Sequence, residues 1–261
     1  MKLKLINTAV AVVLAIALGS CSTDNDVVNS TEGSGSLKIK FDHRYGDVDF
    51  IMGAPYITSQ GETIKVDNIK YIVSNIVLTK EDGSVYVYPK SKSYFIIKEQ
   101  TPSLFTIELT DVPAGNYKTV KFGIGVDQEQ FNLGAAGQGD FLAQAQSEGM
   151  MWSWSAGYKF LAFEGNFTSA TVTDPTLFKV HTGQTGTHYN YTEVTLDMPD
   201  KALVRSTITP QIHVMADLSK ILDGATKISL SPQPNIMGGA VLASITANVS
   251  TMFSVDHVHN D

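Results

Sequence analysis

The sequence predicts an all-β protein: a single β-sandwich domain of immunoglobulin-like or Greek-key type, with a few short helices. Short runs of alternating apolar and polar residues recur along the chain, turn residues separate them, and helical stretches are scarce. Alternation with a period of two places one face of a strand in a core. Many short strands bounded by turns are typical of a sandwich or barrel.

Residues 1–20 predict a lipoprotein signal peptide. Lys2 and Lys4 precede an apolar run at residues 9–18, which is shorter than the roughly 20 residues that cross a bilayer. Small residues then lead to Cys21 in the form of a lipobox, so we expect Cys21 to be acylated and to begin the mature chain. Because Cys21 is the only cysteine, the mature body has no disulfide and no thiolate metal ligand.

Residues 21–36 predict the acylated cysteine followed by a flexible tether. Gly, Ser, Asn and acidic residues dominate there, without apolar periodicity. Asp24 and Asp26 resemble the acidic signals that send some lipoproteins to the cell surface. We therefore expect an exported chain anchored by lipid in the cell envelope, with the outer membrane favoured and surface exposure left open.

The charge of the mature chain argues against nucleic acid as a partner. Removal of Lys2 and Lys4 leaves 17 basic against 26 acidic residues, a net charge of −9. No basic patch is evident, and arginine occurs only at Arg44 and Arg205. Nucleic acid and anionic headgroups are poor partners for such a surface, so the expected membrane contact is the lipid anchor.

The remaining residues, 37–261, predict one domain without a further break. Strands are expected at residues 36–41, 69–78, 83–88, 93–98, 105–109, 117–126, 157–163, 192–198, 202–208, 211–216 and 226–230. Short helices are expected at residues 141–147 and 218–224. Residues 240–253 are ambiguous, because Ala favours a helix while Val, Ile and Thr favour a strand.

Histidines are the main candidates for metal ligands. His257 and His259 are two residues apart, so in an extended chain both imidazoles point to the same side and can chelate one ion. The alternative is an exposed terminal tail. His213 alternates with apolar neighbours, which predicts that it faces outward, toward solvent or toward a site.

Two further histidines lie in other contexts. His181 belongs to a stretch, residues 180–188, whose composition predicts a loop, and His43 follows the end of a strand. Asp42 and Asp256 each precede a histidine and are candidates for outer-shell partners of a metal ligand. Imidazoles without thiolates suit copper or zinc.

Residues 150–160 form the most aromatic run in the chain and contain both tryptophans. As a strand, this run would place Trp152 and Trp154 on one face. A buried core strand is the ordinary interpretation. The functional alternatives are a thioether pair for Cu(I) from Met150 and Met151, or a redox-active indole beside a metal.

Several of these stretches together resemble the MbnP-like family, whose namesakes are exported copper-binding proteins linked to methanobactin and copper handling. The match is carried by residues 41–43, 71–76, 112–117, 122–127, 151–160, 180–183 and 256–259. The tryptophan block followed by a His-x-Gly block is its most specific part.

The resemblance implies a β-sandwich, a copper site built from histidines and, in some members, a tryptophan oxidised to kynurenine by a partner dihaem peroxidase. By motif, His43 and His181 carry over best as copper ligands, followed by the other three candidates: His213, His257 and His259. Trp152 and Trp154 are both candidates for oxidation.

The leading hypothesis is a cell-envelope lipoprotein that binds copper through histidines, for scavenging, storage or delivery. The alternative is a surface module without metal that recognises glycan or protein through exposed aromatics, for which the candidates are Tyr45, Tyr56, Tyr189 and Tyr191. No hydrolase motif, phosphate loop or nucleophile–base pair is evident, so we do not expect an enzyme. Copper redox activity stays open.

Overall fold

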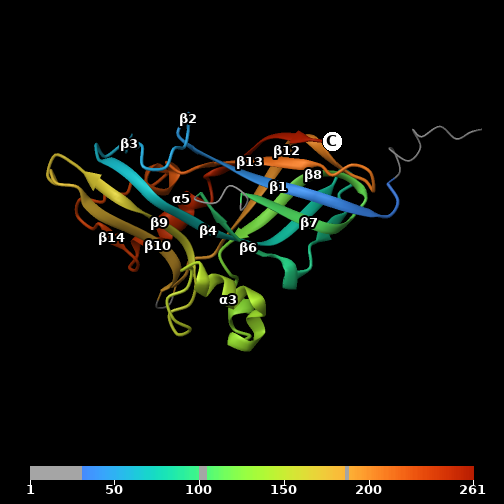
Figure 1. Ribbon diagram of the computed structural model, residues 1–261, viewed down its shortest axis with the longest axis horizontal. Helices are drawn as coiled ribbons and strands as arrows, with labels where there is room; N and C mark the ends of the chain where they lie inside the picture. Colours follow the sequence, from blue (N-terminus) through green and yellow to red (C-terminus); the bar gives the residue numbers. More distant parts are fainter. Residues whose placement is uncertain (1–30, 100–104, 186–187) are drawn as a thin grey trace, which may run out of the picture.

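Two β-sheets packed face to face form the body of the protein, which confirms the predicted sandwich (Figure 1). The computed structural model describes residues 31–99, 105–185 and 188–261, so Cys21 and the signal peptide lie outside the described residues. The smaller sheet contains β15 (Phe253–His259), β13 (Gln211–Asp217), β1 (Ser34–Tyr45), β2 (Val48–Asp49) and β7 (Thr106–Pro113). Within it, β13 runs parallel to β1 on one side and antiparallel to β15 on the other.

The larger sheet is organised around one long strand, β4 (Thr63–Lys80). The first half of β4 pairs with β9 and the second half with β8. The other members are β9 (Lys159–Thr168), β10 (Thr176–Thr185), β11 (His188–Tyr189), β8 (Gly115–Ile124), β12 (Thr192–Val204), β3 (Pro55–Ile57), β5 (Val85–Val87), β6 (Tyr94–Lys98) and β14 (Asn235–Ile236).

Aromatic side chains from both sheets meet in a shared core. Phe41 and Phe253 of the smaller sheet pack edge-to-face against Tyr71 and Phe122 of the larger one, with ring centroids 5.3–6.0 Å apart. All four rings are buried. Such pairs stabilise a fold by about 0.5–1.5 kcal/mol each beyond their buried area. The two sheets are therefore held together by close packing of large side chains.

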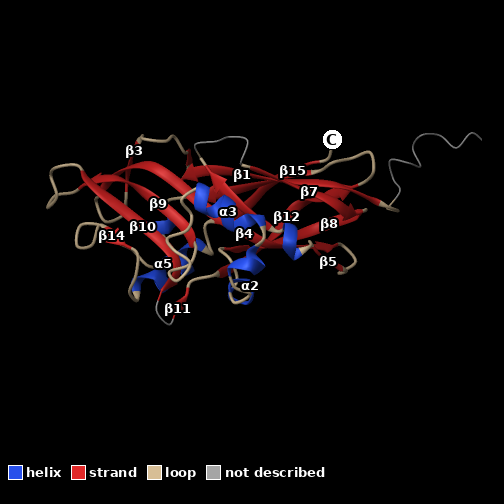
Figure 2. Cartoon of the chain, turned by 60° about the horizontal axis from the view of Figure 1, so that its bottom comes forward, coloured by secondary structure: helices blue, strands red, loops and turns tan. Residues whose placement is uncertain are grey.

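A helical insertion between β8 and β9 covers part of the outer face of the larger sheet (Figure 2). It contains α2 (Gln128–Phe131), η3 (Ala135–Gln138) and α3 (Asp140–Ser147). A second apolar cluster lies beneath it and includes Ile72, Met150, Tyr158 and Phe160. This part of the larger sheet is thus buried on both faces.

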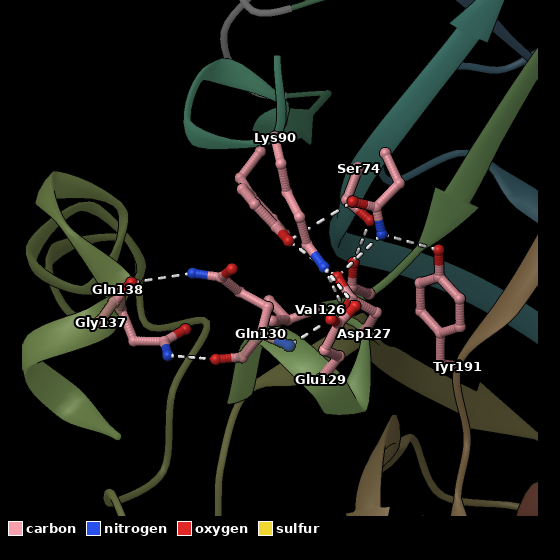
Figure 3. A network of polar contacts seen from close by, with 12 residues as sticks. Ser74, Lys90, Val126, Asp127, Glu129, Gln130, Gly137, Gln138 and Tyr191 are labelled. Atoms are coloured by element: carbon pink, nitrogen blue, oxygen red, sulfur yellow. Dashed lines mark hydrogen bonds and ion pairs between the residues drawn. The ribbon is translucent and has the colours of Figure 1, made fainter. Parts of the chain in front are cut away.

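A polar network ties the insertion to the sheet (Figure 3). Asp127 caps α2 by accepting a hydrogen bond from the backbone N–H of Gln130, and it accepts further ones from Asn75, Lys90 and Tyr94 at 2.7–2.9 Å. Burial raises the pKa of Asp127, but these hydrogen bonds outweigh burial and lower the pKa to about 2. The carboxylate therefore stays ionised and organises the start of the insertion.

Short helices occur where the sequence predicts them, in α3 and α4 (Lys220–Asp223), and a further helix is α5 (Val241–Val249). The ambiguous stretch at residues 240–253 resolves into α5 followed by the first residue of β15. Across the described ranges, no helix is both long and apolar enough to cross a membrane.

The strand predicted at residues 226–230 is wrong. Only an isolated bridge at Lys227 is present there. The backbone N–H of Leu230 donates to the carboxylate of Glu62, which is buried and also accepts from Ser229 and Ser231. Because the carboxylate of Glu62 accepts the hydrogen bond from this backbone N–H group, the group does not need a partner in a neighbouring strand.

The loop predicted at residues 180–188 is also wrong for its first part, because residues 180–185 lie in β10. Trp152 of the insertion packs over this strand, next to His181 and Gly183. Residues 180–183 are consequently buried on both faces of the sheet. A strand covered on both sides loses the alternation that identifies strands in a sequence.

Candidate metal centre

Three histidines from two adjacent strands converge on the outer face of the smaller sheet. In β13, the neighbours of His213 in sequence face the core, so His213 faces outward. The Cα of His213 pairs with that of His257 in β15, and Gln211 pairs with His259 in the same ladder. Two rungs of one ladder therefore carry all three imidazoles.

An irregularity in β15 sets the orientation of His257. The register of the ladder shifts between His213 and Val214 of β13. As a result, Val255 and Val258 both pack against the core although they are three residues apart. Both residues between them, Asp256 and His257, lie on the outer side.

The three rings lie in contact with one another. The ring of His213 stacks on that of His257, with centroids 4.2 Å apart, and His259 stands edge-on to both at 5.1 and 4.6 Å. The Nε2 atoms of His257 and His259 are 3.1 Å apart. One nitrogen from each ring can be chosen so that all three lie within 4.8 Å of one another.

Carboxylates contact the Nδ1 atoms of two of the three rings and thereby orient these rings. The Nδ1 of His213 lies 2.8 Å from Asp42 Oδ2, and the Nδ1 of His257 lies 2.7 Å from Asp256 Oδ2. Lys40 in turn pairs with the other oxygen of Asp42 at 2.7 Å. When Nδ1 donates its hydrogen to a carboxylate, the lone pair of the ring is left on Nε2, so both rings present a ligand atom away from the carboxylate.

The local electrostatics keep this arrangement competent to bind a cation. Burial lowers the pKa of His213, although its hydrogen bond to Asp42 opposes this, so the ring favours the neutral form that binds metals. Burial raises the pKa of Asp42, but hydrogen bonds from Lys40 and His213 outweigh it and lower the pKa overall. A neutral imidazole thus faces an ionised carboxylate.

The donor set fits a transition-metal ion. A four-coordinate ion with bonds of about 2.0–2.1 Å has neighbouring ligand atoms about 2.9 Å apart in square-planar and about 3.3 Å apart in tetrahedral geometry. The separation of 3.1 Å between His257 Nε2 and His259 Nε2 falls between these values.

His43 does not join this cluster, although it lies in the neighbouring strand. It follows Asp42 in β1 and so points to the opposite side, into the space between the sheets. Its Nε2 lies 2.9 Å from the hydroxyl of Tyr71 and its Nδ1 lies 2.6 Å from Glu99 Oε2. Both ring nitrogens of His43 are therefore occupied by protein partners.

His181 lies at a third place, on the outer face of the larger sheet. Its Nε2 is 2.5 Å from Glu164 Oε1, and this hydrogen bond is the main reason that the pKa of Glu164 falls to about 2. Its Nδ1 is buried and has no hydrogen-bond partner among the described residues. Within the described ranges, the group formed by His213, His257 and His259 is the one set of three metal-binding side chains that converges.

Comparisons with known proteins agree with this fold. A family model described as MbnP matches residues 34–238. The chain belongs to the MbnP family. The structure of MbnP from Methylosinus trichosporium superposes with a TM-score of 0.51 at 15% identity, covering 87% of this chain and 99% of that one. No curated protein matches the chain.

In this MbnP-family chain, the two tryptophans have different surroundings. Trp152 lies 6.0 Å from His181 between ring centroids, and the ammonium of Lys159 lies 5.9 Å from its ring. Trp154 instead stacks on Phe131 of α2 at 4.8 Å. Of the two candidates for oxidation, Trp152 is the one beside a histidine.

The family match ends at residue 238, before β15 begins. Two of the three converging histidines of this MbnP-family chain, His257 and His259, therefore lie beyond the matched region. Sequence reasoning named Asp42 as an outer-shell residue, but its histidine partner is His213 rather than the adjacent His43. It did not single out Gln211, although this residue lies two positions before His213 on the same face of β13, and its Nε2 is 2.7 Å from the Nε2 of that ring.

Proposed function

We propose that this chain is a cell-envelope lipoprotein that binds one copper ion through His213, His257 and His259, and that it scavenges, stores or delivers copper. The observation that carries the proposal is the convergence of these imidazoles, with ligand nitrogens within 4.8 Å of one another. The resemblance to a family of copper-binding proteins supports the choice of metal, and the lack of cysteine beyond Cys21 supports a site of nitrogen ligands.

The chemistry of the donor set favours copper over zinc. Imidazole suits both metals, but sites of given nitrogen and oxygen ligands generally bind Cu²⁺ more tightly than Zn²⁺. Asp42 and Asp256 do not need to touch the ion, because their charges act through the rings they orient. When bound, copper supplies a positive charge and, if it cycles between oxidation states, an electron.

The exposure of the ligands indicates how an ion reaches the site. His213 is buried beneath the two other rings, whereas His257 is half-buried and His259 is exposed. An ion arriving from solvent meets the β15 histidines first and His213 last. Loading and release therefore take place on the open face of the smaller sheet, as a delivery or scavenging protein requires.

The lipid anchor on Cys21 remains a separate prediction. Acylation would tether the domain through the residues that precede β1. Cys21→Ala should move the protein from the membrane fraction to the soluble fraction of the envelope, with copper binding unchanged. Retention of the variant in the membrane fraction would contradict anchoring by this cysteine.

The peroxidase-type partner also remains a prediction, since it rests on the resemblance alone. If a partner oxidises a tryptophan, the proximity of Trp152 to His181 favours that residue over Trp154. Mass spectrometry of peptides from the protein isolated from its host would detect kynurenine and assign its position. Oxidation at Trp154 alone would contradict this choice.

The alternative of a surface aromatic platform finds little support in the structure. Tyr45 and Tyr56 are buried and stack on each other with centroids 4.4 Å apart. Tyr189 and Tyr191 are partly buried against the cluster beneath the insertion. The expectation that these tyrosines are exposed is wrong for the first pair, so no shared platform results.

Titration of the purified protein with Cu(II), Cu(I) and Zn(II) tests the copper proposal. We expect one copper per chain and a stabilisation of about 2.7 kcal/mol at a hundredfold excess over Kd. Replacing His213, His257 or His259 by Ala should abolish tight binding, whereas His188→Ala, an exposed histidine in β11, should not. Failure of both copper oxidation states to bind would end the proposal. Loss of binding in His181→Ala instead would move the site to the larger sheet.

A further inference from the structure

The side-chain amide of Gln211 occupies the position in front of the ligand nitrogen of His213. Its Nε2 lies 2.7 Å from the Nε2 of His213. Because the Nδ1 of His213 faces Asp42, the Nε2 of the ring carries the lone pair, and the amide of Gln211 donates to it. The side-chain N–H group of Gln211 thus occupies the position in front of His213 Nε2 that a metal ion would take.

The backbone fixes Gln211 beside the other ligands. It lies two residues before His213 in β13, on the same side of the sheet, and its Cα pairs directly with that of His259. On its other side it pairs with Lys38 of β1. The amide therefore belongs to the same two rungs as the three imidazoles and cannot be far from any ion they hold.

A cation on His213 reverses the orientation that this amide prefers. The amide now directs the positive end of its dipole, the N–H group, at the lone pair of His213. A metal bound to that lone pair repels the N–H group and attracts the carbonyl oxygen. Rotation about the last side-chain bond exchanges the two ends, and that torsion is broad and two-fold.

The geometry allows the oxygen to become a ligand after a small movement. Neighbouring ligands of a tetrahedral ion with bonds of about 2.0–2.2 Å lie roughly 3.3 Å apart. The amide head lies 2.7 Å from His213 Nε2, so it needs to withdraw by only about 0.6 Å as it turns. Carboxamide oxygen is a weak ligand for copper and also occurs as an axial ligand in copper sites.

We propose that the amide oxygen of Gln211 is the fourth ligand of the metal held by His213, His257 and His259. This inference rests on the proposed copper site. The four ligands would all be neutral, so the charge of the ion is balanced only at a distance by Asp42 and Asp256. An uncharged weak fourth ligand on the open face suits a site from which an acceptor withdraws the ion.

Three variants test the role of Gln211. Gln211→Leu keeps the size of the side chain and removes the oxygen, Gln211→Glu replaces the amide with a stronger anionic ligand, and Gln233→Leu is a matched control on an exposed glutamine. We expect Cu(II) affinity to fall about tenfold or more in Gln211→Leu, to rise in Gln211→Glu and to stay constant in the control. The electron paramagnetic resonance spectrum of bound Cu(II) should change in both Gln211 variants.

The opposing outcomes are distinct. If Gln211 is merely displaced by the ion, Gln211→Leu binds Cu(II) as tightly as the unaltered protein or more tightly, because a competing hydrogen bond is gone; this overturns the inference. Weaker binding with an unchanged spectrum overturns it as well, since the ligand set would then be the same. If the unaltered protein binds no copper, or His213→Ala binds it normally, the proposed function itself fails. Melting of the metal-free variants checks that the sheet is intact.

Discussion

The carboxylate behind His213 should contribute more to copper affinity than the carboxylate behind His257. Asp42 has a side chain 27% exposed and contacts a ring that is 11% exposed, at 2.8 Å. Asp256 is 61% exposed and its histidine 42%, at a similar distance of 2.7 Å. The two contacts have nearly the same length but differ in burial, and Asp42 also pairs with Lys40.

The magnitude follows from the surroundings of each pair. Loss of an outer-shell partner of a metal-binding histidine reduces affinity by about 10–100-fold, or about 1.4–2.8 kcal/mol, and Asp42→Asn should fall in this range. Solvent screens the pair formed by Asp256, and exposed ion pairs are worth about 0–1 kcal/mol. Asp256→Asn should therefore weaken binding by about fivefold or less.

Competition against a chelator of known affinity, at fixed pH and ionic strength, measures both variants. Asn keeps the shape of Asp, so the apo proteins should melt within a few degrees of the unaltered chain. Equal losses in the two variants, or an Asp42→Asn affinity within twofold of the original, would refute the reasoning. Added salt should reduce the effect of Asp256→Asn and leave most of that of Asp42→Asn.

Three further predictions concern the fold. Asp127→Asn should lose about 1–2 kcal/mol of stability at pH 7. Because the pKa of Asp127 is lowered to about 2 in the folded protein, this contribution is present above the unfolded pKa near 4 and disappears as the pH falls through the folded pKa. Glu129→Gln, which removes an 87% exposed partner of the same lysine, should change little in the same acid denaturation series. Glu62→Ala should cost about 3 kcal/mol in urea unfolding, because it leaves the buried N–H of Leu230 and the partly buried donors of Ser229 and Ser231 without an acceptor. A loss below 1 kcal/mol would contradict that role. Gly165→Ala should lower the melting temperature markedly, since an added Cβ would lie 2.0 Å from the carbonyl oxygen of Lys65, and normal melting would show that the strands can separate there.

Pairing with a carboxylate does not by itself distinguish a metal ligand in this protein. His43 and His181 are also paired, with Glu99 and Glu164. What sets His213 and His257 apart is that their rings stack on each other and that His259 stands edge-on to both, so that three imidazoles share one place. Among the described residues, the histidine–carboxylate pair thus occurs without a metal centre at His43 and His181, and as part of a candidate metal centre at His213 and His257.

The sequence by itself determined the sandwich and the chemistry available to it. Alternation along β1 and β13 depends on one face being buried, which is a local property, so residues 36–41 and 211–216 could be recognised directly. The single cysteine at Cys21 likewise limited any metal site in the body to nitrogen, oxygen and thioether ligands. The pair of histidines in β15 was visible as a chelating spacing.

Only the tertiary structure decided which histidines meet. Motif similarity favoured His43 and His181. However, successive residues of a strand point to opposite faces, so His43 points into the core, and His181 lies in β10, which belongs to a different sheet from the β13 strand of His213. The encounter of His213 with His257 depends on the register of two strands separated by about forty residues and on one irregularity in that ladder. Register arises from how the whole core packs, because a slip of one residue would turn every side chain of β15 to the other face.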